Sequence, residues 1–201
     1  MSYLGYDLLQ VPSNVPNDPS SDWSRSTAMF DPGIGARSIF DRDTQPSIER
    51  EFEWICARRQ EIVAAREWVL ARKGRLVPFW IPTLRRDLEL HFNIMHADEQ
   101  ISIERCGYSE HLYPSNNGRR HLAFYPSWAN PVYRKVTSAE DNGSIEVLGL
   151  SSSLGAICET SKLVSFLILA RLASDDVTIQ YITDSIAKIV FRYVELPLEA
   201  P

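Results

Sequence analysis

Alternating apolar and polar positions predict β-strands along most of the chain after residue 46. In residues 47–56 (SIEREFEWIC) Phe52, Trp54 and Cys56 stand at every second position, although Ile48, Phe52 and Ile55 also satisfy a helical spacing. Residues 86–95 (RDLELHFNIM) alternate most clearly and predict a strand. Further strands are expected at 100–106, 119–126, 132–138, 144–150, 161–172, 177–183 and 187–196.

Many short strands in series with one helix predict a mainly β fold class. We expect a β-sandwich or a split β-barrel with one amphipathic α-helix and an extended N-terminal arm. The continuous apolar character of residues 163–172 predicts a central strand that is covered on both faces.

Residues 57–73 are the strong helix candidate, because they are rich in Ala, Arg, Glu and Leu and Gly74 follows them. On a helical wheel they show two apolar stripes on opposite sides. One stripe comprises Ile62, Val63, Val69 and Leu70 around Arg66, and the other comprises Ala57, Ala64, Trp68 and Ala71. A surface helix needs only one apolar face, so we expect the second face to meet more of the same chain or another subunit.

Residues 10–46 predict an extended arm or loop, because five prolines and many Ser, Asn and Asp residues occur there without any period. Such a segment has too little apolar surface to become ordered alone, so either the following domain or a neighbouring subunit is expected to hold it. We therefore divide the chain into an N-terminal arm at 1–46 and a single β-rich domain at 47–201 that contains the helix.

Composition favours a soluble assembly protein over a nucleic-acid binder. The net charge of -5 argues against general binding of nucleic acid, and no run approaches the roughly 20 apolar residues that span a bilayer. The N-terminus lacks a basic leader, so we expect a protein that no signal peptide exports.

The chain has 17 arginines and four lysines, and arginine suits interfacial pairing better than lysine does. An arginine-rich host genome would also explain this bias.

No catalytic or metal-binding motif stands out in the sequence. Cys56, Cys106 and Cys158 are far apart and odd in number, so we expect reduced thiols in the core. GLSSSLGA lacks the pattern of a nucleophile elbow, DPGIGAR lacks that of a phosphate cradle, and the histidine spacing does not demand a metal. We therefore predict no enzyme activity, no catalytic residue, no cofactor and no metal.

The segment 57–86 carries the best interaction signal, with eight basic residues against two acidic ones. Pairing with the glutamates of 49–53 would explain this surplus, and so would an acidic groove on a neighbouring subunit. Pro78 and Pro82 withhold backbone donors and favour an edge or irregular strand, where a partner docks. The predicted interface residues are Arg59, Arg66, Trp68, Arg75, Phe79, Trp80, Arg85 and Arg86.

The order of strand, helix, ARKGRLVPFWIPTLRRDLEL, many strands and a closing DSIAKIVFRYVELPLEAP resembles the distal tail protein family of long-tailed bacteriophages. Members of that family often follow a helix with Gly-Arg and an aromatic run that leads to an Asp. The corresponding residues are Gly74, Arg75, Phe79, Trp80 and Asp87. The resemblance spans residues 47–95 and the C-terminal strands.

This resemblance implies a β-sandwich or split barrel that forms a six-fold ring at the tip of the tail tube. The implied partners are further copies of the chain, the tail tube protein, the tape measure protein, and the hub and fibre proteins. It implies a place in the virion after assembly in the host cytoplasm, with no membrane partner and no sequence-specific nucleic acid, although DNA would pass through the ring. The chain has little room for the second, carbohydrate-binding-like domain of many members, and it lacks the four cysteines of iron–sulphur hub proteins.

Two other functions fit the same sequence. One is another β-rich tail component, such as an adaptor at the end of the tube. The other is a monomeric carbohydrate-binding β-sandwich that stacks sugars on exposed aromatic side chains.

Overall fold

A computed structural model describes residues 2–9, 11, 21–34, 36–41, 46–115 and 117–197. Strands account for 46% and helical turns for 12% of the structure, so the predicted mainly β class is confirmed and is consistent with a β-sandwich. The chain forms two compact units. The first comprises Met1–Gln10, Phe79–Leu169 and Leu196–Pro201, and the second comprises Val11–Pro78 and Ala170–Glu195. Both units combine distant stretches of the chain, and they share the strand Leu163–Leu172. The predicted division between residues 46 and 47 stays a prediction.

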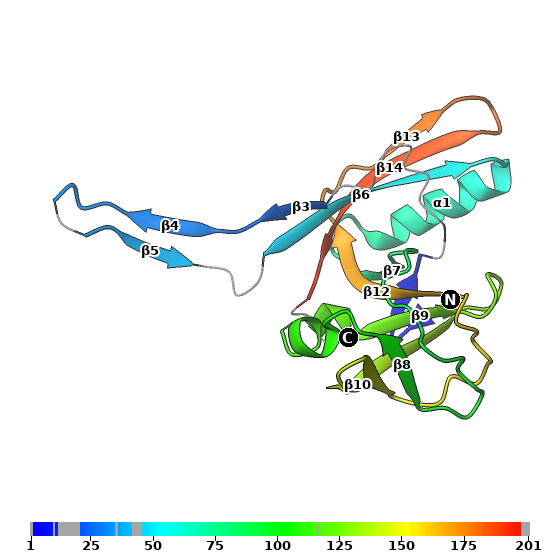
Figure 1. Ribbon diagram of the computed structural model, residues 1–201. Helices are drawn as coiled ribbons and strands as arrows, with labels where there is room; N and C mark the ends of the chain where they lie inside the picture. Colours follow the sequence, from blue (N-terminus) through cyan, green and yellow to red (C-terminus); the bar gives the residue numbers. More distant parts are fainter. Residues whose placement is uncertain are drawn as a thin grey trace. The chain divides into compact units, whose positions relative to one another are not determined.

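The first unit is built from strands that pair in the order β1-β2-β7-β12-β9-β10-β11-β8 (Figure 1). In the described part of this unit β2 pairs with β7 in parallel, whereas the pairs β1–β2, β8–β11, β9–β10, β9–β12 and β10–β11 are antiparallel. A π-helical turn (Tyr108–Leu112) and a 3₁₀ turn (Asn117–Arg119) lie between β8 and β9. The bounds are β1 (Ser2–Tyr3), β2 (Tyr6–Leu8), β7 (Phe79–Pro82), β8 (Gln100–Glu104), β9 (His121–Tyr125), β10 (Val132–Asp141), β11 (Ile145–Leu150) and β12 (Leu163–Leu172).

The centre of the first unit is strand β12, which is buried on both faces as its apolar run predicts. In this unit it lies between β7 and β9. Side chains from four strands meet in one core cluster that comprises Leu8, Trp80, Ala123, Tyr125, Leu167 and Leu169. This packing explains why residues 163–172 alternate so little: both sides of the strand face apolar neighbours.

The expected strand at 86–95 is wrong. Leu88, Leu90 and Ile94 are buried as the alternation predicts, but the segment makes only isolated bridges. Its backbone first donates to Val164 of β12 and then exchanges hydrogen bonds with β8, so no continuous ladder forms with either neighbour. Phe92, the fourth apolar position of the alternation, is exposed. The alternation therefore identifies three of its four positions as buried, and it does not predict the partner.

Strand β7 also differs from its prediction as an edge or irregular strand. All four of its residues are buried, and it pairs with β2 on one side and β12 on the other. Pro82 is its last residue and Pro78 lies just before it, so the missing N–H groups fall at the ends of the ladder. The prolines bound an interior strand, and they do not mark a docking edge.

The second unit is an antiparallel sheet in which β6 pairs with β3 and β14, and β14 pairs also with β13 and with the end of β12. The helix of this unit's described part, α1 (Arg59–Arg72), packs beside β6 (Figure 1). A separate hairpin is formed by β4 (Thr27–Phe30) and β5 (Ser38–Asp41). The other bounds are β3 (Ser21–Ser24), β6 (Ser47–Cys56), β13 (Thr178–Tyr181) and β14 (Ala187–Glu195).

The predicted N-terminal arm is described in part. Residues 1, 10, 12–20, 35 and 42–45 of it lie outside the described residues. The described part contains β1 and β2, which belong to the first unit, and β3 and the β4–β5 hairpin, so the arm contains more strand than its composition predicts. No helix in the described part of the chain has the length and apolar character needed to cross a membrane.

A buried histidine makes the stability of the first unit depend on pH. His121 lies in β9 with its Nδ1 3.1 Å from the Tyr3 hydroxyl and its ring 4.7 Å from the Trp80 ring. Burial, and secondarily the Lys135 cation, lowers the pKa of His121 to about 4. Burial also raises the pKa of Tyr3 to about 12, so the Tyr3 hydroxyl keeps its proton.

We expect the fold to lose roughly 2 kcal/mol from this residue as the pH falls from 7 to 4.5. In that window the unfolded chain, with an imidazole pKa of about 6.5, takes up a proton that the folded chain excludes. The stability that neutral His121 contributes is therefore fully present above a pH of about 6.5 and is lost as the pH falls toward the folded pKa of about 4. Urea unfolding at both pH values measures the loss, and His121→Gln, which cannot titrate, should show a correspondingly smaller difference.

Candidate protein interface

Helix α1 uses one face to cover the sheet of the second unit. Ile62 and Ala65 are buried, and Trp68 packs with ring-centroid distances of 6.4 Å to Trp54 and 5.6 Å to Phe191. This face runs between the two stripes that the helical wheel predicts, so neither stripe as a whole is the buried face. Val63 from the first stripe is exposed, whereas Trp68 from the second stripe turns inward. The aromatic side chains of β6 and β14 decide which helix positions are buried.

Arg72 is a buried cation at the end of α1. Its guanidinium lies 5.1 Å from the centroid of the Trp68 ring, and its Nη1 donates to the Pro78 carbonyl at 3.3 Å. A buried charge needs such partners, since burial without them would cost several kcal/mol. Arg72 therefore connects the last turn of the helix to the chain that leads into β7.

The helix ends as predicted, close to Gly74. Lys73 and Gly74 both adopt the left-handed conformation, with φ of 49° and 65°. A Cβ on Gly74 would lie 2.3 Å from the Asp175 carboxylate, which accepts from the Arg75 backbone N–H at 2.9 Å. The Arg75 Nη2 donates to the same carboxylate at 3.2 Å. The predicted interface residue Arg75 thus already has a partner in its own unit.

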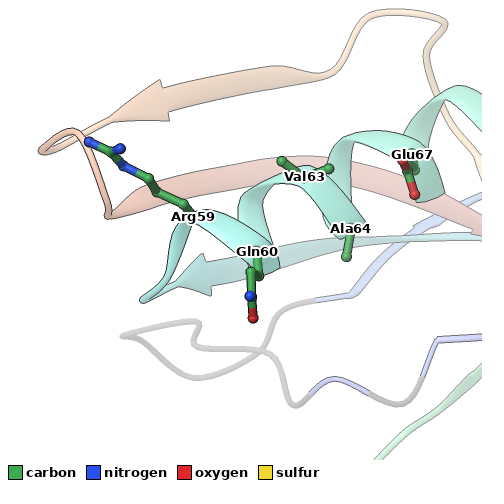
Figure 2. Close-up of a pocket in the computed structure, with 5 residues that line it drawn as sticks. All are labelled: Arg59, Gln60, Val63, Ala64 and Glu67. Carbon is green, nitrogen blue, oxygen red and sulfur yellow. The ribbon is translucent and has the colours of Figure 1, made fainter.

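The outward face of α1 carries a shallow depression of about 380 Å³ that is open to solvent. Figure 2 shows Arg59 at one end of the row of lining residues and Glu67 at the other. Val63 and Ala64 lie between them, and Val63 is 54% exposed. Leu70 follows further along the helix and is 73% exposed. This face therefore combines an apolar centre with one basic and one acidic end.

The glutamates of β6 take their cations from β14. Glu49 and Glu51 lie 3.6 Å and 3.7 Å from the Arg192 guanidinium, and Glu53 lies 2.7 Å from Lys188 Nζ. The antiparallel register of β6 and β14 brings these side chains together. Glu51 stands directly opposite Arg192, and Glu53 lies two residues further along β6, toward Lys188. The ion pairs of these glutamates are thus made with β14, and the acidic groove on a neighbouring subunit stays a prediction.

The other predicted interface residues fall into different environments. Phe79 and Trp80 are buried in the first unit, which corrects the expectation that their side chains lie at a joint between molecules. Arg85 and Arg86 are exposed in the first unit, where Arg86 donates to the Ser161 carbonyl at 2.9 Å. Arg66 is exposed on α1. Arg59, Arg66 and Arg75 therefore remain as surface candidates, and all three belong to the second unit.

The β4–β5 hairpin is an exposed apolar feature that the sequence analysis missed. Met29, Phe30, Ile39 and Phe40 are each more than half exposed, as is Ile34 near its turn. The turn is stabilised by Asp31, which accepts from the Gly33 N–H at 3.0 Å and pairs with Arg37 at 2.8 Å. The Asp-Pro-Gly sequence was the available signal for this turn, since two short apolar runs flank it.

Among the described residues, no three His, Cys, Asp or Glu side chains are arranged to hold a metal ion. Cys56 and Cys158 are buried thiols as expected, whereas Cys106 is exposed, because it follows β8 at the start of a loop. No protein-family model and no curated protein matches this sequence. The apolar surfaces of the second unit are therefore the main guide to function.

Proposed function

We propose that the chain is a non-enzymatic structural protein that forms a ring at the distal end of a phage tail tube. In this role it joins the tube to the hub and fibres and contacts further copies of itself, the tail tube protein and the tape measure protein. The proposal places it in the virion at the tail tip. The resemblance of residues 71–90 and the closing strands to distal tail proteins supplies the identity of the assembly.

The observation that carries the proposal is the exposed apolar surface of the second unit. Val63 and Leu70 project from α1, and four large apolar side chains project from the β4–β5 hairpin. Exposed apolar groups that lie close together mark protein–protein contacts, whereas isolated ones are common on any surface. On the hairpin, Met29 stands opposite Ile39, so these two exposed side chains are neighbours. Arginines beside such groups are typical of interfaces, and Arg59 and Arg66 occupy those positions here.

Native mass spectrometry and negative-stain microscopy of the purified protein, alone and with tail tube and hub proteins, test the proposal. We expect a closed ring, either alone or on the tube. We also expect Arg66→Glu to weaken ring formation without a change in the far-UV circular dichroism spectrum. Lys162→Glu, a charge reversal at an exposed position of the first unit, is the matched control.

A protein that stays monomeric with every tail partner and binds glycans would contradict this function. That result would favour the carbohydrate-binding module, for which Trp23 and Trp128 are the exposed tryptophans of the described chain. Binding to the tube end without a ring would instead favour an adaptor.

A further inference from the structure

The outward face of α1 carries a regular row of exposed side chains that runs from the first residue of the helix to the residue just past its last. Successive members of the row are four, three, four and three residues apart, so they lie one above another on the same side of the helix. The row comprises Arg59, Val63, Arg66, Leu70 and Lys73. Basic and apolar side chains therefore alternate along the whole length of this face.

The row is basic although the chain as a whole is acidic. The chain has a net charge of -5, whereas this face has three cations against one carboxylate, that of Glu67. Among the residues that the structure describes, no carboxylate lies within ion-pair distance of Arg59, Arg66 or Lys73. Arg59 donates from its Nε to the Asp184 carbonyl at 3.3 Å, and this neutral group does not cancel its charge. The three cations are thus available to carboxylates of another molecule.

Two apolar side chains form the centre of the same face. Val63 is 54% and Leu70 is 73% exposed. The shallow depression of the helix surface is lined by Val63 and by the small Ala64 side chain beside it (Figure 2). Covering these side chains with apolar groups of a partner would be favourable, because it removes them from water. The occupant must therefore bring apolar side chains as well as carboxylates.

The spacing of the row favours an α-helix over a β-strand as the occupant. Steps of four and three residues average about 3.5 residues, which is the repeat of the seam at which two helices pack side by side. At a rise of about 1.5 Å per residue, the row repeats roughly every 5 Å along the helix axis. Side chains on one face of a strand repeat roughly every 6.7 Å, so a strand would fall out of step with the row within a few residues.

We infer that the outward face of α1 binds an acidic amphipathic helix of a partner protein. The apolar side chains of that helix cover Val63 and Leu70. Its aspartates and glutamates lie along one edge and pair with Arg59, Arg66 and Lys73. This inference rests on the proposed function, because it names the chemistry of one partner in the assembly.

Two other occupants fit this face less well. A second copy of α1 would bring two basic rows together, and like charges at an interface repel. An anionic lipid surface would also attract the cations. However, helices that insert into such a surface carry a broad apolar face with large side chains, and this row has only Val63 and Leu70.

Fluorescence anisotropy with the full chain and three labelled synthetic peptides, each about three heptads long, tests the inference. In the acidic peptide, leucine and glutamate alternate in steps of four and three residues, and alanine and glutamine fill the other positions to favour a helix. The basic peptide has lysine in place of glutamate. The scrambled peptide has the composition of the acidic peptide without its repeat, so it carries the same charge and presents no seam.

We expect the acidic peptide to bind about tenfold more tightly than the scrambled peptide, which corresponds to about 1.4 kcal/mol. Arg66→Glu and Leu70→Ser should each weaken its binding about tenfold, because each removes one component of the row. Lys162→Glu and Ile182→Ser change exposed positions outside α1 and should leave the affinity unchanged. Arg59→Glu combined with Arg66→Glu reverses the charge of the face, so this protein should bind the basic peptide instead.

Equal affinity for the acidic and scrambled peptides would overturn the inference, because charge without a helical repeat would then be sufficient. Binding that Arg66→Glu leaves unchanged would overturn it too, as would binding to phosphatidylserine vesicles by a protein that does not bind the acidic peptide. A ring with the tail tube protein but no peptide binding would overturn the inference and leave the proposed function standing. Peptide binding by a protein that forms no ring with any tail partner would support the inference and contradict the proposed function.

Discussion

Replacing Trp80 with alanine is expected to lower the free energy of unfolding by about 3–5 kcal/mol, because the substitution empties the centre of the first unit. The Trp80 side chain is 1% exposed and belongs to the core cluster around β12. Its Nε1 donates to the Tyr3 carbonyl at 2.8 Å, and its ring lies edge-on to the Tyr3 ring at 5.3 Å. The variant would lose both the packing and a buried hydrogen bond.

Trp128→Ala is the matched control for this prediction. Trp128 is 71% exposed and contacts Tyr125 with its ring, so its removal should cost less than about 1 kcal/mol. Urea unfolding followed by far-UV circular dichroism measures both variants without relying on tryptophan fluorescence. A Trp80→Ala protein with wild-type stability and defective assembly would show that Trp80 acts at an interface, as the sequence alone suggests.

The strands were the most predictable part of the fold, because alternation and continuous apolar runs directly report burial. Strands β8 to β14 all lie where the sequence predicts them. The failure at 86–95 has a physical cause: Leu88, Leu90 and Ile94 are buried, but a ladder also requires one neighbouring strand over its whole length. Pairing partners are distant in sequence, and alternation does not encode them.

The helix illustrates a second limit of sequence reasoning. Its composition and the glycine that follows predict where it ends, and it ends at Arg72. The two predicted stripes do not give its buried face, because Trp54 and Phe191, which lie on β6 and β14, determine that Trp68 faces inward. A helical wheel contains only the helix, so it cannot include these neighbours.

The candidate site could be predicted only in part. Arg59 and Arg66 lie on the exposed helix as the basic surplus predicts, but Phe79 and Trp80 are core residues. Aromatic residues between prolines are consistent with both a core strand and a docking edge, and only the pairing of β7 separates these cases. The hairpin escaped notice because its two apolar runs are too short to show a period.

Replacing Glu146 with glutamine is expected to cost about 2–4 kcal/mol of stability, since it removes a buried carboxylate that accepts several backbone hydrogen bonds. Glu146 on β11 is fully buried. Its two oxygens accept from the Gly107 N–H at 2.7 Å and from the Tyr108 N–H at 3.0 Å. These donors begin the π-helical turn Tyr108–Leu112, whose first N–H groups have no partner within the turn.

Glutamine has nearly the same size as glutamate, but only one of its two terminal atoms accepts a hydrogen bond. In Glu146→Gln the amide nitrogen would face a backbone N–H, so two donors would oppose each other in a buried place. Glu99→Gln, at an exposed position, is the control and should change stability by less than about 0.5 kcal/mol. Urea unfolding measures both variants, and hydrogen exchange should show lost protection at the Gly107 and Tyr108 amides.

The same variant separates stability from assembly. Glu146 belongs to the first unit, whereas α1 and the β4–β5 hairpin belong to the second. At temperatures where Glu146→Gln remains folded, we therefore expect it to form the same oligomers as the wild type in native mass spectrometry. A variant of unchanged stability would contradict the role of the carboxylate in holding the turn. A folded variant that loses these oligomers would instead show that the first unit takes part in the contact between copies.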